Sequence, residues 1–407
     1  MGRAKQDWLE SEERGWKDPV EKFVCPDCVD DEYLKDIIRQ SAEKTQCDYC
    51  GRRTRSRSVA PILVLMGPIG STVAYYFNEP TQAGVPWDEG AFVFDSTDTH
   101  DVLMSISLDC HDELFEDIAD SFINDDWAPA AGGHWASSHP HEDFIGSWNN
   151  FVQIVKHEVR YFFQHRPPGV DWPDDFEPGR YEPQYLLPAI GSFAEELGLI
   201  KTLPSRMPLF RVRERGQNDT WELNAKELGA PPPELANAGR MNPAGISYLY
   251  LAFDEKTALG EVLSGPPSTA AIGSFETVQD LTVLDLSDLP TLPSIFDDGQ
   301  RWVLERLLFL QRFAKAISKP VRKDGREHVE YVPSQVVSEY FSRVFLSNDG
   351  HPINGLIYPS AVCPGGKNVV IFPTREEFKP SFCTVSFVRG QDVGLADWAE
   401  FSAAITR

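Results

Sequence analysis

Four cysteines near the start of the chain have the spacing of a metal-binding site. They form two Cys-x-x-Cys pairs, Cys25 with Cys28 and Cys47 with Cys50. In each pair the chain can bend so that both sulfurs face one ion, and four thiolates complete the closed tetrahedral site that is typical of structural zinc. Gly51 follows the second pair and can take the positive φ that a closing turn needs. We therefore predict a structural zinc site on these four cysteines; four reduced thiols without a metal are the alternative.

A second set of side chains capable of chemistry lies in the latter half of the chain, in segments where apolar and polar residues alternate as they do in β-strands. Leu209–Arg213 alternates in this way, which leaves Arg211 and Arg213 on one face of a predicted strand. Tyr248–Ala252 has the pattern of a second strand and contains Tyr250. Guanidinium groups bind phosphate and carboxylate groups well, so these strands offer cationic and aromatic groups to a ligand.

A short helix is predicted directly after the second strand. Within Glu255–Leu263 the apolar residues repeat at helical spacing, and Glu261 lies roughly 60° from Ala258 on the shoulder of the apolar stripe. From that position Glu261 could face a cleft. The remaining elements predicted in this region are helices at Arg301–Ile317 and Val332–Phe345 and strands at Gly355–Tyr358 and Asn368–Phe372.

Four segments of this region carry its polar residues: LFRVR at Leu209–Arg213, GRMNPAGISYLYLA at Gly239–Ala252, TALGEVL at Thr257–Leu263 and GLIYPSAVCPGGKNVVIFP at Gly355–Pro373. Together they resemble the RES domain, which is named after an Arg, a Glu and a Ser. RES toxins are bacterial proteins with an ADP-ribosyltransferase-like fold, and the resemblance implies that they destroy NAD. Arg240, Tyr250 and Glu261 stand in the RES order at close to the RES spacing.

The resemblance implies a role for each polar residue. Arg211 and Arg240 would bind the pyrophosphate of NAD through charge-assisted hydrogen bonds. Tyr250 would stack on the nicotinamide or its ribose. Glu261 would stabilise the positive charge that develops on the ribose when the N-glycosidic bond breaks. Ser360 would bind the nicotinamide ribose or orient Glu261.

Further residues follow from the same resemblance. Asn368 matches an Asn of the family pattern and joins the residues expected to bind the dinucleotide. The Pro-Ser-Gln triplet at Pro333 resembles a segment of larger family members. It adds a second group of candidates at the edge of the site: Ser334, Gln335 and Glu339.

Each of the main candidates also has a simpler interpretation. Arg211 fits an exposed strand residue, Arg240 the partner of a neighbouring acid, and Tyr250 a core residue. Ser360 fits a turn beside a proline. A charged residue at the edge of a helical stripe, such as Glu261, is usually only solvated.

The middle of the chain, residues 60 to 200, is predicted to be mainly helical. It loosely resembles the HEPN-like domain found ahead of some RES domains. Arg160 and His165 fit the Arg-x4–6-His motif of HEPN ribonucleases, although Tyr161 follows the Arg where that family usually has a polar residue. A structural or dimerising helical domain is the alternative to an active ribonuclease. We expect an α+β protein with a zinc-binding segment (1–58), a helical HEPN-like domain (59–200) and a mixed α/β, ADP-ribosyltransferase-like RES domain (201–407).

Composition restricts the classes of function. The formal net charge of −24 argues against a general nucleic-acid binder, because neutralising phosphates requires clustered Lys and Arg. The sequence offers no stretch of about 18 apolar residues and no charged-then-apolar leader at its start, so we expect a cytoplasmic protein that does not interact with membranes.

The leading hypothesis is an NAD glycohydrolase or phosphorolase that acts as the toxin of a toxin–antitoxin or phage-defence system. One alternative is ADP-ribosyl transfer to a protein. Another is a HEPN ribonuclease with a nucleotide-sensing C-terminal domain, and the last is a non-enzymatic interaction module. Expected partners are NAD, an antitoxin or regulatory protein, and further copies of the chain.

Overall fold

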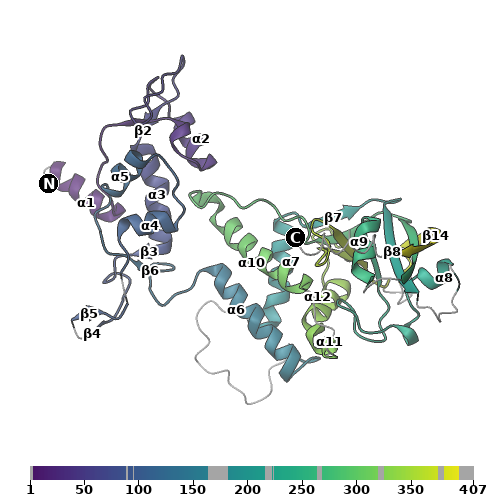
Figure 1. The fold of residues 1–407 in the computed structure, drawn as a ribbon. Helices are drawn as coiled ribbons and strands as arrows, with labels where there is room; N and C mark the ends of the chain where they lie inside the picture. Colours follow the sequence, from purple (N-terminus) through teal and green to yellow (C-terminus); the bar gives the residue numbers. More distant parts are fainter. Residues whose placement is uncertain are drawn as a thin grey trace. The chain divides into compact units, whose positions relative to one another are not determined.

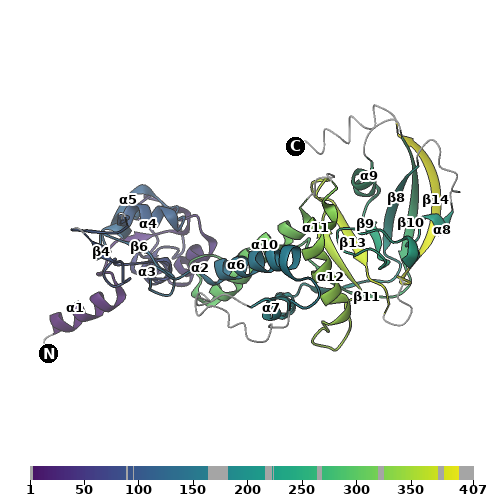
Figure 2. The same ribbon diagram turned by 90° about the horizontal axis from the view of Figure 1, so that it is seen from below.

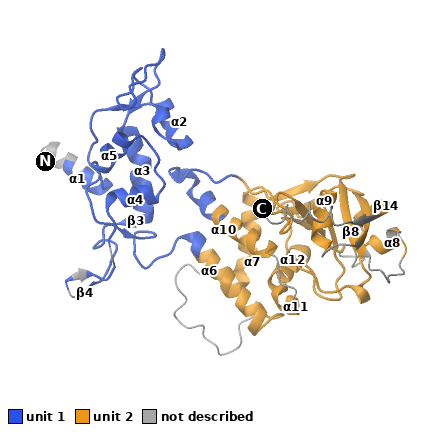
Figure 3. Ribbon diagram, viewed as in Figure 1, with its two compact units in different colours: residues 1–142, 291–306 blue, residues 143–290, 307–407 orange. Residues whose placement is uncertain are grey.

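The chain divides into two compact units. The computed structural model describes residues 3–88, 90–94, 96–163, 182–215, 222, 224–263, 268–319, 325–374 and 380–393. The first unit comprises Met1–Glu142 and Thr291–Arg306, and the second comprises Asp143–Pro290 and Leu307–Arg407 (Figure 3). Two helices, α6 (Pro140–Gln153) and α10 (Arg301–Ser318), begin in the first unit and end in the second.

Short helices and two-stranded ribbons build the first unit (Figure 1). Its core contains the inward faces of α2, α3 and α5 and three of the four paired cysteines. The strands pair as β1 with β2, β3 with β6 and β4 with β5. The elements are α1 (Arg3–Arg14), β1 (Phe23–Val24), α2 (Glu32–Gln40), β2 (Ala60–Pro61), α3 (Leu63–Tyr76), β3 (Phe77–Asn78), β4 (Trp87–Asp88), β5 (Ala91–Phe92), α4 (Thr99–Ser105), α5 (Asp112–Ala119) and β6 (Ala128–Pro129).

A buried carboxylate ties distant segments of this unit together. Glu305 of α10 has only 1% of its side chain exposed, and it accepts hydrogen bonds from the hydroxyl of Tyr75 (2.9 Å) and the backbone N–H of His141 (2.9 Å). The His141 ring lies 2.6 Å from the same carboxylate. Burial opposes the charge on Glu305, but these hydrogen bonds lower its pKa, so the carboxylate stays ionised within the core.

The second unit contains a mixed sheet and a layer of helices. Within the described residues the sheet has eight strands, in the order β14-β10-β8-β9-β13-β12-β11-β7. Neighbouring strands are antiparallel except for β11 and β12, which are parallel. The strands are β7 (Ile200–Leu203), β8 (Pro208–Arg215), β9 (Leu249–Ala252), β10 (Ser268–Thr277), β11 (Leu281–Asp285), β12 (Gly355–Pro359), β13 (Lys367–Ile371) and β14 (Cys383–Val393).

Strand alternation divides this unit into two cores. Leu356 and Tyr358 of β12 face the helices, whereas Ile357 between them belongs to the core on the other face of the sheet. The helices gather on one side of the sheet (Figure 2). They are α6 with the π-helical turn Ile154–Glu158 that follows it, α7 (Pro183–Glu196), α10, α11 (Glu327–Glu330) and α12 (Val332–Arg343).

Two further helices flank the remaining strands. The first, α8 (Ala225–Leu228), contacts β8, β10 and β14. The second, α9 (Glu255–Val262), packs on β8, β9 and β13. The start of α9 is set by Asp254, which accepts hydrogen bonds from the backbone N–H of Thr257 (2.8 Å) and from its hydroxyl (2.7 Å). An N-cap of this kind stabilises a helix by about 1 kcal/mol and fixes where it begins.

The predicted α+β class is confirmed, with a helical N-terminal region and a mixed C-terminal sheet. The helices expected around Glu261, after Arg301 and after Val332 form α9, α10 and α12. Strands β7, β10, β11 and β14 were not predicted from the residue pattern. The predicted domain limits at 58 and 200 remain predictions. The two compact units divide the chain at other positions, after Glu142, Pro290 and Arg306. No helix in the described part of the chain has the length and apolar character to cross a bilayer.

We predict that Phe313→Ala destabilises the second unit by about 3–5 kcal/mol, because removing a large buried aromatic side chain leaves a cavity with about this cost in free energy. Phe313 is fully buried on α10 and meets Trp148 edge to face, with ring centroids 4.9 Å apart. Urea unfolding followed by tryptophan fluorescence measures the change. The exposed neighbour Gln311→Ala serves as the control and should shift the transition by less than about 0.5 kcal/mol. An equal, small shift for both variants would contradict this packing.

Candidate functional site

A pocket in the second unit collects most of the polar residues singled out in the sequence. Its volume is about 390 Å³, and it lies where α9, β8, β9, β12 and β13 meet the loop before β9. This volume is within the range of small-molecule sites, roughly 300–1,000 Å³. The lining includes Arg211, Arg240, Tyr250, Glu261, Tyr331, Tyr358 and Asn368.

Two side chains hold the carboxylate of Glu261 in place. The hydroxyl of Ser360 donates to its Oε1 at 2.7 Å, and the side-chain amide of Asn368 donates to the same oxygen at 2.6 Å. Hydrogen bonds to a charged group are each worth about 1.5–3 kcal/mol. Among the described residues, no donor contacts Oε2. The arrangement therefore fixes one carboxylate oxygen and leaves the other available to a ligand.

Close packing brings the loop that contains Ser360 against α9. A Cβ added to Gly260 would lie 2.4 Å from the sulfur of Cys363, so only glycine allows this approach directly before Glu261. The Ser360 hydroxyl also accepts hydrogen bonds from the backbone N–H groups of Val362 (3.2 Å) and Cys363 (2.9 Å). Ser360 is thus both a turn residue and a partner of Glu261, so its two interpretations are compatible.

The loop that contains Arg240 is held by side chains from two elements. The Tyr250 hydroxyl accepts from the backbone N–H of Met241 (2.9 Å) and donates to Oδ1 of Asn242 (2.7 Å). From α12, the Ser334 hydroxyl donates to the carbonyl of Arg240, and the Gln335 amide donates to the carbonyls of Gly239 (2.8 Å) and Asn242 (3.0 Å). These contacts fix the backbone at Arg240 and engage the hydroxyl of Tyr250.

Both pocket arginines donate hydrogen bonds to backbone carbonyl oxygens. Arg211 donates to the carbonyl of Gly229 (2.8 Å), and Arg240 donates to the carbonyls of Ile317 (3.4 Å) and Lys319 (2.5 Å). Within the described residues neither forms an ion pair with an acid. Burial, together with the nearby Arg213, lowers the pKa of Arg211 to about 10, which still leaves the guanidinium protonated at neutral pH. By contrast, Arg213 pairs with Glu227 at 3.0 Å.

These positively charged groups stand beside one carboxylate in a pocket with aromatic walls. Burial raises the pKa of Tyr358, and the charge of Glu261 adds to the effect, so the phenol stays neutral. Such a pocket can bind a small anion and stabilise positive charge that develops near the carboxylate.

Comparison with known protein families finds matches in two parts of the chain. Residues 208–387 match the RES domain, and residues 40–168 match the HEPN/RES N-terminal domain 1. The chain is a RES-domain protein. This family includes NAD-related toxins, and the match indicates an enzyme that acts on NAD. No curated protein matches the sequence.

The pocket of this RES-domain protein contains five of the six residues predicted for catalysis and dinucleotide binding, namely Arg211, Arg240, Tyr250, Glu261 and Asn368. The sixth, Ser360, reaches the pocket through Glu261. Their individual roles remain predictions. Of the second group, Ser334 and Gln335 contact the backbone around Arg240, whereas Glu339 is not among the described residues that line the pocket.

Two tyrosines of the pocket wall, Tyr358 and Tyr331, had not been selected from the sequence, and neither had Asn242, which accepts a hydrogen bond from Tyr250 behind the wall. Tyr358 lies in the segment Gly355–Pro373 that carried the resemblance, and the structure pairs it with Asn368 across β12 and β13. Asn242 lies in the segment that starts at Gly239. Tyr331 lies where α11 and α12 meet, and no sequence pattern indicated that it would reach the pocket.

One of the two residues of the predicted HEPN motif lies within the described part of the chain. Arg160 is exposed, and His165 lies outside the described residues. The ribonuclease interpretation therefore remains an untested alternative for this RES-domain protein.

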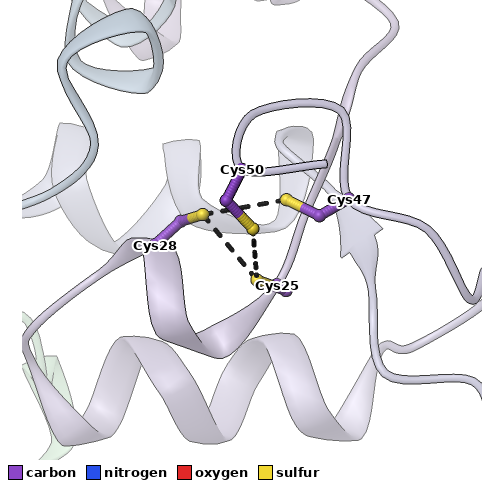
Figure 4. Close-up of side chains that lie close together, drawn as sticks. All are labelled: Cys25, Cys28, Cys47 and Cys50. Atoms are coloured by element: carbon purple, nitrogen blue, oxygen red, sulfur yellow. Dashed lines mark hydrogen bonds between the residues drawn. The ribbon is translucent and has the colours of Figure 1, made fainter. Parts of the chain in front are cut away.

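The second predicted site is the cysteine cluster of the first unit (Figure 4). The sulfur of Cys25 lies 3.7 Å from that of Cys28 and 3.5 Å from that of Cys50, and the sulfurs of Cys28 and Cys47 are 3.7 Å apart. A tetrahedron with Zn–S bonds of about 2.3 Å requires sulfurs about 3.8 Å apart, whereas a disulfide requires about 2 Å. Gly51 has the expected positive φ of 68°. The cluster could hold a metal such as zinc.

The chemistry of the four sulfurs supports the same conclusion. Burial and neighbouring thiols raise the pKa of Cys25 and Cys28, because several thiolates this close together repel one another. A bound cation would remove that penalty and keep the thiolates charged.

We predict that the purified chain contains one metal ion at this cluster and that Cys47→Ser loses most of it. Elemental analysis of the dialysed protein measures the content. The midpoint temperature of thermal unfolding should also be lower in this variant, because metal binding contributes to the free energy of folding. Cys383→Ser, whose thiol lies in the second unit, is the control. Equal metal content in the Cys47→Ser variant and in the wild type would rule the site out.

Proposed function

We propose that this protein cleaves the N-glycosidic bond of NAD and releases nicotinamide, with water or inorganic phosphate as the acceptor. The observation that carries the proposal is the Glu261 carboxylate, held by Ser360 and Asn368 in a pocket that also contains Arg211 and Arg240. The RES match supports NAD as the substrate.

Each group in the pocket has a defined task in this reaction. Arg240 and Arg211 would bind the pyrophosphate through charge-assisted hydrogen bonds, which their lack of an acidic partner in the described chain favours. Tyr250 would place its ring against the nicotinamide ribose, since its hydroxyl is engaged by Met241 and Asn242. The aromatic ring and the two arginines together would orient the dinucleotide.

Bond cleavage places the developing positive charge next to Glu261. The bond between the nicotinamide nitrogen and the ribose C1′ breaks, and nicotinamide leaves with the electron pair as a neutral molecule. The carboxylate of Glu261 stabilises the oxocarbenium-like ribose and binds a ribose hydroxyl. Water or phosphate then forms the new bond to C1′; when water is the acceptor, its proton is released to solvent.

We further propose that the cysteine cluster is a structural zinc site and that NAD depletion makes the protein a toxin controlled by an antitoxin or regulatory protein. The four thiolates leave no open position for catalysis. In this account zinc stabilises the first unit, and the chemistry belongs to the pocket of the second.

We expect the wild-type chain to release nicotinamide from NAD, and Glu261→Gln to lower kcat by roughly 100- to 1,000-fold, the usual cost of losing one group that stabilises transition-state charge. Chromatographic measurement of nicotinamide, with and without added phosphate, distinguishes ADP-ribose from its phosphorylated form as the second product. Glu276→Gln, at an exposed position on β10, is the matched control and should retain activity. A folded wild-type protein that releases no nicotinamide would refute the proposal.

Ser360→Ala should lower kcat by roughly 10- to 100-fold with little change in KM, because it removes one hydrogen bond to a charged carboxylate and leaves the pocket arginines intact. Steady-state kinetics with NAD measures both constants. Ser386→Ala removes a comparable serine from β14, where the hydroxyl donates to the carbonyl of Ser274, and should behave like the wild type. A rise in KM at constant kcat would instead assign Ser360 to substrate binding.

A further inference from the structure

A second cavity lies next to the candidate pocket within the same unit. Its volume is about 650 Å³. Its walls come from α6 and the following turn, which supply Trp148 and Lys156, and from the segment around α11 and the start of α12. These helices lie on one side of the sheet (Figure 2).

The second cavity is positively charged, although the chain as a whole is strongly acidic. Among the described residues that line it, four are cationic and one is acidic, so their formal charges sum to +3, whereas the chain carries −24. The acid, Glu330, pairs with Lys156 at 2.7 Å. The other cations are Arg240, Lys319 and Arg326. In an acidic protein, a cavity of this charge favours an anionic ligand.

The two cavities share a wall. Arg240 and Tyr331 line both of them. The contacts of Arg240 with the carbonyls of Ile317 and Lys319 hold its guanidinium toward residues that line the second cavity. Ser334 contacts the backbone of Arg240 and lines the second cavity as well. The cation expected to bind pyrophosphate is thus located where the cavities meet.

Size supports a ligand that occupies both. The pocket around Glu261 has about 390 Å³, which is near the lower end for small-molecule sites. A dinucleotide has two nucleosides on either side of a pyrophosphate. If the nicotinamide ribose lies at Glu261 and the pyrophosphate at Arg240, the adenylate continues into the second cavity.

We infer that the second cavity binds the adenylate half of NAD, with Lys156 and Lys319 near its phosphate. This inference rests on the proposed function. It has a consequence for the organisation of the chain, because α6 and Lys156 belong to the part matched by the HEPN/RES N-terminal domain, residues 40–168. That domain then supplies part of the substrate site of the RES domain.

Paired substrates test the inference in the full-length protein. Lys156→Ala and Lys319→Ala should each raise KM for NAD roughly 10- to 100-fold, the value of one charge-assisted contact. Neither should change the cleavage of nicotinamide mononucleotide, which lacks the adenylate. Lys315→Ala, an exposed lysine on α10 outside both cavities, should leave both reactions unchanged. Equal loss with both substrates, or no loss with either, would overturn the inference.

Calorimetry with AMP separates this inference from the proposed function. AMP should bind the wild type and the Glu261→Gln variant alike, bind Lys319→Ala at least 10-fold more weakly, and compete with NAD. If AMP binds in this way but nicotinamide is never released, the glycosidic activity fails and the nucleotide cavity stands. Absence of AMP binding, or AMP binding that does not compete with NAD, overturns the assignment of the second cavity.

Discussion

Two hydrogen bonds that meet at one oxygen, Oε1 of Glu261, position the carboxylate on which the proposed reaction depends. Ser360 donates from the loop after β12, and Asn368 donates from β13, so the position of the carboxylate is set by the sheet as well as by its own helix. Glu261 is otherwise exposed on α9, where an isolated carboxylate would sample many rotamers. The close contact between Gly260 and Cys363 keeps the helix and the loop near enough for the hydrogen bonds to form.

The second property of this region is the positive charge of its two arginines. The chain has 62 acidic and 38 basic residues, yet Arg211 and Arg240 contact carbonyl oxygens and form no ion pair with an acid in the described structure. A carbonyl orients a guanidinium without neutralising it. Both arginines therefore keep their charge for an anion, which an acidic protein surface would otherwise repel.

Residue pattern and family resemblance together selected most of the polar residues that meet in the candidate pocket, and the reasons differ from residue to residue. The helical position of Glu261 indicated that it could face a cleft, and the segments around Arg240, Ser360 and Asn368 carried the resemblance. Pattern alone could not reveal that Ser334 and Gln335 hold the loop of Arg240, because those contacts span more than 90 residues. Tyr331 and the second cavity depend on how α6, α11 and α12 pack, which local periodicity does not encode. For the same reason the long pairing of β10 with β14 was missed: it joins segments more than 100 residues apart.

The most direct test of the central claim is a crystal structure of the Glu261→Gln variant with NAD bound, because this change keeps the shape of the side chain while slowing cleavage. We expect the ribose C1′ of the nicotinamide half within about 3–4 Å of the side chain at position 261, the distance of a reactive arrangement, with the pyrophosphate at Arg240. NAD bound elsewhere, or bound with its nicotinamide ribose far from position 261, would contradict it.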